Sequence, residues 1–160
     1  MTLVKRIDMA LHVQELCAKN GINVNYVPLD DRRPFYCANR VNNSITIRPT
    51  KNTGYYVSAL HEIGHLIGPN QTVDNDRFEM EVGAWKYAMT TAIVWTDTAT
   101  KVMKKALKSY GMKEQHWDNI YLECIRYAKS KLELGVDWEY DNNGDHTALT
   151  PKAKFIANAS

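Results

Sequence analysis

The stretch His61-Glu62-Ile63-Gly64-His65 constrains this chain more than any other, because its two histidines can act together only on a helix. An α-helix turns by about 100° per residue, so side chains four residues apart project from one side, about 6 Å apart along the axis. Two neutral imidazoles at that separation can bind a single Zn²⁺ ion. The spacing therefore predicts a helix from Tyr55 to Ile67, which Gly68-Pro69 would end.

Glu62 lies on the same turn but is rotated away from the direction in which the histidines point. This placement suits a carboxylate that takes a proton from a zinc-bound water, whose pKa zinc lowers towards about 7. Chance alone should produce HExxH in roughly one chain of this length in a few hundred, so an ordinary charged helix is the alternative. Gly64 costs a helix up to about 1 kcal/mol relative to alanine, which indicates close packing there.

A catalytic zinc ion usually has three protein ligands and one open position, so a third ligand is needed. The next predicted helix, capped by Asp74 or Asp76, carries Glu81 inside its apolar stripe and Glu79 about 100° outside it. A carboxylate aimed at a core is costly unless it is paired or binds a metal. Glu81 is therefore the predicted third ligand, with an ion pair to Arg77 as the alternative. Glu79 is expected to be solvated or to support the site.

The remaining polar side chains are weaker candidates. His146, in the C-terminal segment, could compete with Glu81 as a ligand, whereas His12 and His116 are expected at the surface. No single residue can be assigned to stabilise the oxyanion of a hydrolytic intermediate. The candidates for that role are Tyr55, Tyr56, Arg77, Tyr121 and His146.

Periodicity in the N-terminal third predicts a helix and a small sheet. Residues 3–19 repeat apolar side chains at helical spacing and end at Asn20-Gly21, whereas residues 22–29 alternate as a half-buried strand does. Residues 35–40 and 44–48 have the pattern of two further strands, which three residues rich in asparagine would join into a β-hairpin. We therefore expect a short antiparallel sheet.

Beyond the histidine-bearing helix, helical periodicity predicts three more helices. They extend from about residue 76 to 95, from an N-cap at 96–98 to 110, and from 113 to 134. The expected fold class is α+β, with the HExxH helix packed on the helix that carries Glu81. A length of 160 residues suits one domain, so residues 1–135 are predicted to form it and 136–160 a loop or tail.

Charge and composition favour a globular protein. Hydrophobic residues make up 44% and charged residues 24%, near the averages for soluble proteins. A net charge of +2, from 20 basic and 18 acidic residues, does not favour nucleic-acid binding. A row of lysines in the third predicted helix is more typical of a solvated face than of a phosphate-binding stripe. Its members are Lys101, Lys104, Lys105 and Lys108.

The first apolar stretch does not have the pattern of a secretory signal. Arg6 and Asp8 interrupt the first apolar stretch, and no run reaches the roughly 18 apolar residues of a membrane span. The expected compartment is therefore the cytoplasm, with no membrane partner. Cys17, Cys37 and Cys124 are widely spaced, and we expect them to be buried free thiols.

In the order of its elements the chain resembles the ImmA/IrrE-type minimal gluzincins, which include small HExxH proteins of phages and mobile elements. The likeness covers about residues 3–95 and ends with a glutamate four residues before an aromatic, here Glu81 and Trp85. The chain departs from the family at Val82, where alanine is usual. It departs again at Trp85, where many larger gluzincins place an aspartate.

The resemblance implies that His61, His65 and Glu81 bind zinc and that Glu62 is the catalytic base. It further implies a zinc metallopeptidase that cleaves a specific protein, such as a repressor or another regulator. The alternative is a non-catalytic protein of the same fold that binds a protein or nucleic acid and uses zinc structurally. In that case His146 would close the metal site, because structural zinc usually has four protein ligands. The lysine row, Trp117, Trp138 and Tyr140 would then matter more than Glu62.

A third hypothesis is a protease that acts on DNA-bound proteins. The histidine that such a protease usually has as its third ligand is not found at a comparable distance after His65. This hypothesis is therefore the weakest of the three.

Overall fold

The computed structural model describes residues 4–28, 30–31, 36–111 and 114–132. The fold class of this part is α+β, as predicted, with five helices and three strands. The helices are α1 (Arg6–Lys19), α2 (Thr53–Ile67), α3 (Arg77–Thr91), α4 (Asp97–Ser109) and α5 (Glu114–Leu132). The strands are β1 (Asn23–Tyr26), β2 (Cys37–Asn39) and β3 (Ser44–Ile47). The predicted tail, residues 136–160, lies outside the described residues.

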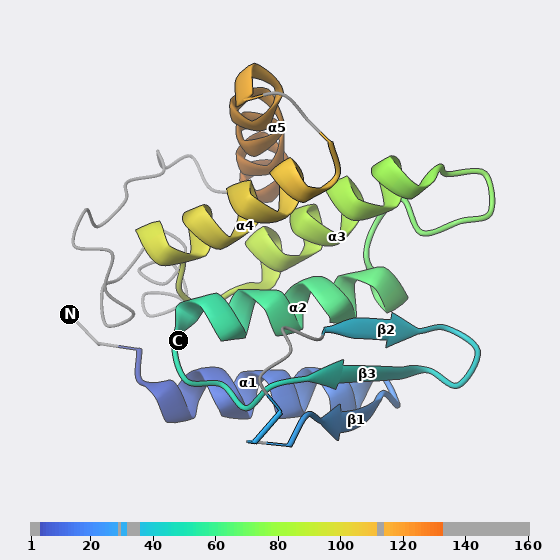
Figure 1. Ribbon diagram of the computed structural model, residues 1–160, viewed down its shortest axis with the longest axis vertical. Coiled ribbons are helices and arrows are strands. Elements are labelled where there is room, and N and C mark those ends of the chain that lie inside the picture. Colours follow the sequence, from blue (N-terminus) through green and yellow to red (C-terminus); the bar gives the residue numbers. More distant parts are fainter. Residues whose placement is uncertain (1–3, 29, 32–35, 112–113, 133–160) are drawn as a thin grey trace.

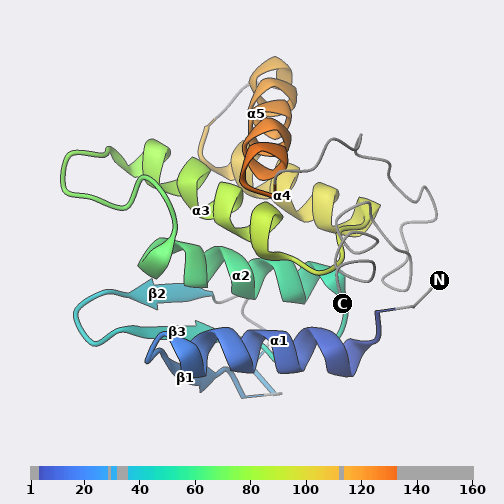
Figure 2. The ribbon, with the colours of Figure 1, turned by 180° about the vertical axis from the view of Figure 1, so that it is seen from behind.

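The elements stack in layers around α2. Figure 1 shows the sheet and α1 at the base, α2 above them, α3 and α4 above α2, and α5 crossing at the top. The view from behind shows that α1 covers the rear of the sheet (Figure 2). Helix α2 contacts α1, α3, α4, β2 and β3. This central position buries most of α2, including the first two residues of the HExxH motif, His61 and Glu62.

The sheet is mixed, so the prediction of a purely antiparallel sheet is wrong. Its strand order is β1-β3-β2. The predicted hairpin pairs β2 with β3 antiparallel, and Asn43 in its turn has a φ of 50°, which asparagine tolerates. Strand β3 then returns between the first two strands and pairs parallel with β1. Local periodicity cannot reveal this insertion, because strand order depends on contacts between distant segments.

Side-chain caps begin α3 and α4 at two predicted positions, Asp76 and Thr96. The prediction that α3 continues to about residue 95 is wrong, because the helix ends at Thr91. The backbone N–H of Ile93 donates to the Tyr56 hydroxyl, 3.0 Å away, and so leaves the helical hydrogen-bond pattern. A long-range hydrogen bond therefore sets a boundary that helical propensity does not.

Helices α2 and α3 cross closely because glycines lie at the crossing. A Cβ atom on Gly64 would lie 2.8 Å from the carbonyl oxygen of Ala84 and 2.9 Å from its Cα. A Cβ atom on Gly83 would overlap the carbonyl oxygen of Pro69. The close packing that Gly64 indicates in the sequence is thus found, and the partner is the backbone of α3.

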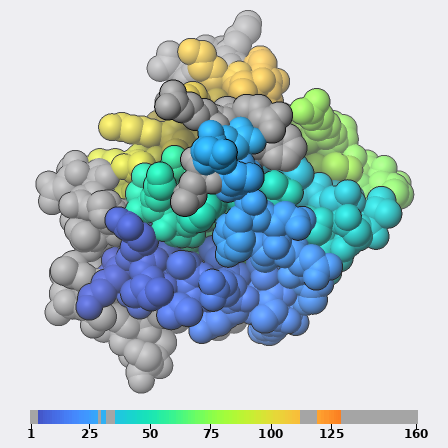
Figure 3. All heavy atoms as spheres, turned by 60° about the horizontal axis from the view of Figure 1, so that its bottom comes forward, coloured from blue at the N-terminus to red at the C-terminus, as the bar shows by residue number. Residues whose placement is uncertain are grey.

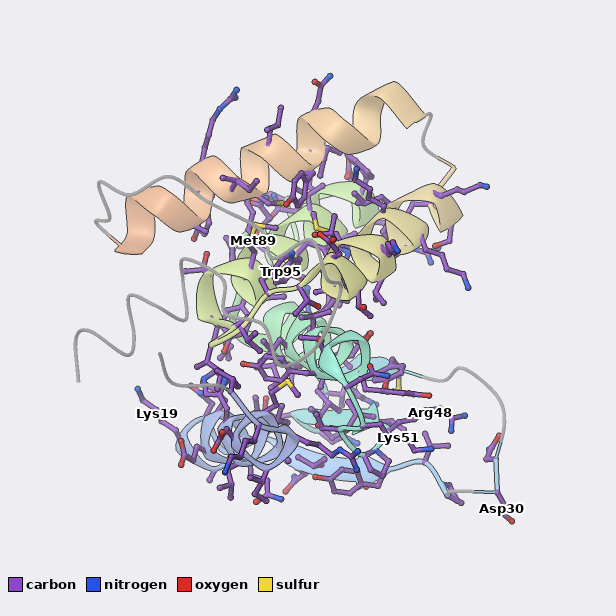
Figure 4. All side chains as sticks on the ribbon, turned by 90° about the vertical axis from the view of Figure 1, so that its left-hand side faces the viewer. Lys19, Asp30, Arg48, Lys51, Met89 and Trp95 are labelled. Atoms are coloured by element: carbon purple, nitrogen blue, oxygen red, sulfur yellow. The ribbon has the colours of Figure 1, made fainter. Side chains whose placement is uncertain are left out.

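The core lies on both sides of α2. Figure 4 shows Met89 and Trp95 in the interior and Lys19 and Asp30 at the periphery. Two of the three cysteines, Cys17 and Cys124, are buried free thiols as predicted, whereas Cys37 is only half-buried. Within the described ranges, no helix has both the length and the apolar character that crossing a membrane requires.

Candidate metal centre

Three side chains predicted as ligands converge on one point between α2 and α3. The Nε2 atom of His61 lies 2.8 Å from Oε2 of Glu81, and Nε2 of His65 lies 3.1 Å from the same oxygen. The two Nε2 atoms are 3.1 Å apart. His61 and His65 are one turn apart on α2, and the glycine crossing brings Glu81 of α3 opposite them. This cluster could hold a metal ion.

The donor set and its spacing fit zinc. Two imidazole nitrogens and one carboxylate oxygen are the ligand types of catalytic zinc sites. Tetrahedral coordination with bonds of 2.0–2.1 Å would separate the ligand atoms by about 3.3 Å, so they need to move apart by only a few tenths of an ångström. The cluster also lies in the wall of a cleft of about 620 Å³. There is therefore room for a fourth, non-protein ligand.

The pKa values of the three side chains in the cluster depend on one another. Burial lowers the pKa of His61, which favours its neutral form. Burial would raise the pKa of Glu81, but hydrogen bonds with His61 and His65 outweigh burial and hold that pKa well below its usual range. Burial likewise would lower the pKa of His65, but its contact with Glu81 raises that pKa overall. The pair of histidines thus stabilises an ionised Glu81.

Glu81 and Glu79, the two glutamates of α3, have different contacts. Glu81 contacts His61 and His65, at 2.8 and 3.1 Å, rather than Arg77. Glu79 is exposed and accepts a hydrogen bond from the Asn75 side chain, so its predicted solvated role is found. An ion pair between Glu81 and Arg77 is not found among the described residues.

Glu62 lines the same cleft and is only 8% exposed. Burial raises its pKa to about 7, with His65 lowering it and Glu81 adding to the rise. A carboxylate with a pKa near neutrality can both accept and return a proton at physiological pH. The residue predicted as the base therefore lies in the wall of the cleft, with a raised pKa in the metal-free protein.

Trp85, one turn after Glu81 on α3, packs against the cluster. The Trp85 ring lies on the His61 imidazole, with centroids 4.3 Å apart and planes inclined by 37°. The Nδ1 atom of His61 is buried and has no hydrogen-bond partner among the residues that the structure describes. Contact with the Trp85 ring, rather than a hydrogen bond to Nδ1, thus holds this imidazole on its far side.

None of the tyrosines proposed for the oxyanion lines the cleft. Tyr56 is fully buried, and its hydroxyl lies 2.6 Å from Nδ1 of His12, which is half-buried rather than at the surface as predicted. Tyr55 and Tyr121 also lie away from the cleft lining, and Arg77 lines a neighbouring hollow. His146 lies outside the described residues.

Two tyrosines that the sequence did not single out line the cleft instead. They are Tyr36, just before β2, and Tyr110, at the end of α4. Burial is the main cause of a raised pKa at both, so both hydroxyls stay protonated and can donate hydrogen bonds. Both lie more than 20 residues from the motif in sequence, so no local pattern could identify them.

Comparisons with known proteins add nothing to this geometry. Searches of protein-family models, curated proteins and solved structures found no match to the chain. What can be inferred about function therefore rests on the residues of the cleft.

Proposed function

We propose that this protein is a zinc-dependent metallopeptidase that hydrolyses a peptide bond in a specific protein, such as a regulator or repressor. The observation that carries the proposal is the convergence of His61, His65 and Glu81 on one point in the wall of a cleft that Glu62 also lines. The resemblance to ImmA/IrrE-type minimal gluzincins implies the same ligands and the same base.

In the proposed hydrolysis, the side chains of the cleft have different roles. Zinc, held by the two imidazoles and Glu81, would supply Lewis acidity and lower the pKa of a water ligand. Glu62 takes the proton of the attacking water and returns it to the leaving amine. The Tyr36 hydroxyl stays protonated and so can donate to the oxyanion of the tetrahedral intermediate, whereas the Tyr110 hydroxyl hydrogen-bonds to Glu81.

The cleft suits an extended peptide. Cys37 and Ala38 of β2 line it, and within the described residues β2 is an edge strand, paired with β3 alone. An edge strand offers unpaired backbone groups to which a peptide can add as a further strand. Main-chain pairing would hold a peptide beside the cluster whatever its sequence, and side-chain pockets would then give specificity.

The cleft also bears on the alternative of a non-catalytic protein with structural zinc. A structural zinc site is usually closed by four protein ligands. Here three ligands converge beside open space, which supports a hydrolytic site. The fourth ligand considered from the sequence, His146, lies outside the described residues.

The test compares the wild-type protein with Glu62→Gln, which removes the base and keeps the size of the side chain. Both zinc-loaded proteins are incubated with a synthetic library of peptides, and the products are identified by mass spectrometry. We expect Glu62→Gln to bind zinc like the wild type and to lose at least about 100-fold in cleavage rate, the usual scale for a general base.

The matched control is Glu79→Gln, the same chemical change at an exposed position of α3. It should cleave at the wild-type rate. Cleavage by Glu62→Gln at the wild-type rate would show that the assigned mechanism is wrong. A zinc-loaded wild-type protein that cleaves no peptide in the library would count against a peptidase and for the binding protein.

A further inference from the structure

Gln71, in the loop between α2 and α3, connects three segments through one side-chain amide. Its Nε2 atom donates to the carbonyl oxygens of Pro69, at 3.0 Å, and Met80, at 2.6 Å. Its Oε1 atom accepts from Nη2 of Arg40 at 2.7 Å and lies 3.2 Å from Nδ1 of His65. Every hydrogen-bonding position of this amide is therefore used.

The partners fix which way the amide faces. Backbone carbonyls can only accept, so the amide atom that meets Pro69 and Met80 must be the NH₂ group. A guanidinium can only donate, so the amide atom that meets Arg40 must be the oxygen. The oxygen next to His65 is thus determined by chemistry and by three independent contacts. Because that oxygen only accepts, Nδ1 of His65 must carry a proton.

A proton on Nδ1 leaves Nε2 as the nitrogen that can bind a metal. Nε2 is the atom of His65 that faces Glu81 and His61. Only one ring nitrogen of a neutral imidazole carries a proton, so fixing the proton on Nδ1 exposes the Nε2 lone pair to the cluster. Without a metal, Nε2 faces the Glu81 carboxylate, which also only accepts, so Nε2 then carries a proton too. A metal ion takes the place of the proton on Nε2 and leaves the one on Nδ1.

Arg40 anchors the amide from the β2–β3 hairpin. Besides Gln71, its guanidinium donates to the backbone carbonyl oxygen of His65, at 3.2 Å, through Nε. The space-filling view shows the hairpin next to the loop before α3 (Figure 3), in agreement with the contact between Arg40 and Gln71. Arg40 and Gln71 thus connect the β2–β3 hairpin with the metal cluster through hydrogen bonds.

We propose that Gln71 is the positioning residue for His65: anchored by Arg40, it holds the Nδ1 proton and thereby presents Nε2 to the metal. The proposal rests on the metal site of the proposed function but not on peptide hydrolysis. His61 provides an internal contrast, because its Nδ1 atom has no such acceptor among the described residues and its ring is held by Trp85.

The first experiment uses the zinc-loaded wild-type protein labelled with ¹⁵N. Two-bond ¹H–¹⁵N correlation spectra report which nitrogen of each histidine binds zinc and which carries the proton. We expect His65 to bind zinc through Nε2 and to be protonated at Nδ1. A His65 that binds zinc through Nδ1 would overturn the proposal without any variant, so the test does not depend on a substituted protein that folds.

The second experiment uses Gln71→Met, which is similar in length but removes the acceptor. The Nδ1 proton of zinc-bound His65 should then exchange faster with water, and the zinc Kd should rise by about 10- to 100-fold. The control is Thr72→Val in the same loop, whose hydroxyl contacts Asn75 and not His65. This control should leave the exchange rate of the Nδ1 proton and the zinc Kd unchanged.

An unaltered exchange rate of the Nδ1 proton together with an unaltered zinc Kd in Gln71→Met would refute the positioning role. A weaker zinc affinity with an unaltered exchange rate would also refute it, because the loss would then come from the loop structure alone. A zinc-loaded wild-type protein that shows the expected Nδ1 proton but cleaves no peptide would overturn the proposed function and support the role of Gln71.

Discussion

At the scale of single residues, Glu62 combines two properties that oppose each other. It is buried in the cleft wall, and burial raises the pKa of its carboxyl from 4.5 to about 7. Burial makes its ionised form costly in the metal-free protein, yet hydrolysis needs that form as a base. In the proposed mechanism, burial of Glu62 would thus lower the stability of the metal-free protein, and this loss can be measured.

The stability of the metal-free protein should depend on pH through Glu62. The folded state binds a proton here more tightly than the unfolded state, so stability declines as pH rises from 4.5 to about 7 and no further above that. Glu62→Gln does not titrate. It should therefore exceed the wild type in free energy of unfolding above pH 7, by at most roughly 3 kcal/mol, with the difference vanishing below pH 4.5.

Urea unfolding between pH 4 and 8 in the presence of a chelator measures this difference. The comparison between the two proteins cancels the titration of every other group that the substitution leaves alone. A difference that does not change with pH would show that the Glu62 carboxyl keeps its ordinary pKa when the protein folds.

At the scale of elements, the crossing of α2 and α3 sets the site. The ligands come from two helices, and they meet because Gly64 lets the backbone of Ala84 approach. A bulkier residue at position 64 would move Glu81 away from the histidines. The geometry of the metal centre is thus a consequence of helix packing and not only of the motif.

Gly64→Ala should destabilise the protein and weaken zinc binding. Its Cβ would meet backbone atoms at 2.8 and 2.9 Å, which cannot move aside as a side chain can. The strain of about 1–3 kcal/mol should exceed the gain in helix propensity of about 1 kcal/mol. Chemical unfolding and zinc titration measure both effects.

The control is Gly54→Ala in the first turn of the same helix, where the nearest atoms, at 3.1 Å, belong to the side chains of Asn52 and Val102. It should cost less than Gly64→Ala in both measurements. If Gly64→Ala is as stable as the wild type, the close crossing does not determine the site.

The sequence predicted the parts of the site that depend on local spacing. His61 and His65 share a helix face through the helical period, and Glu81 was recognised because a carboxylate on an apolar stripe needs a partner. Tyr36, Tyr110 and Gln71 were missed, because they reach the site through tertiary contacts. The parallel pairing of β1 with β3 was missed for the same reason, since no period encodes which strands become neighbours.

At the scale of the whole molecule, a metal at the cluster would tie together two layers of the fold. His61 and His65 belong to the central helix, and Glu81 belongs to the layer above it (Figure 1). The three ligand atoms meet only when α2 and α3 are packed, so the unfolded chain cannot present them together. Zinc binding should therefore be coupled to global stability.

Zinc should raise the Tm of the wild-type protein, because a ligand that binds only the folded state stabilises it. At a free concentration about 1,000 times its Kd, the gain is about 4 kcal/mol. Calorimetry with zinc at increasing concentrations measures this, with magnesium as a comparison, since Mg²⁺ prefers six oxygen ligands and should have little effect. Glu81→Gln should lose most of the zinc-dependent rise, because a neutral amide is a poor ligand, whereas Glu79→Gln should keep it. An equal rise in Tm in both variants would show that the zinc ion binds outside this cluster and that its effect on stability does not depend on Glu81.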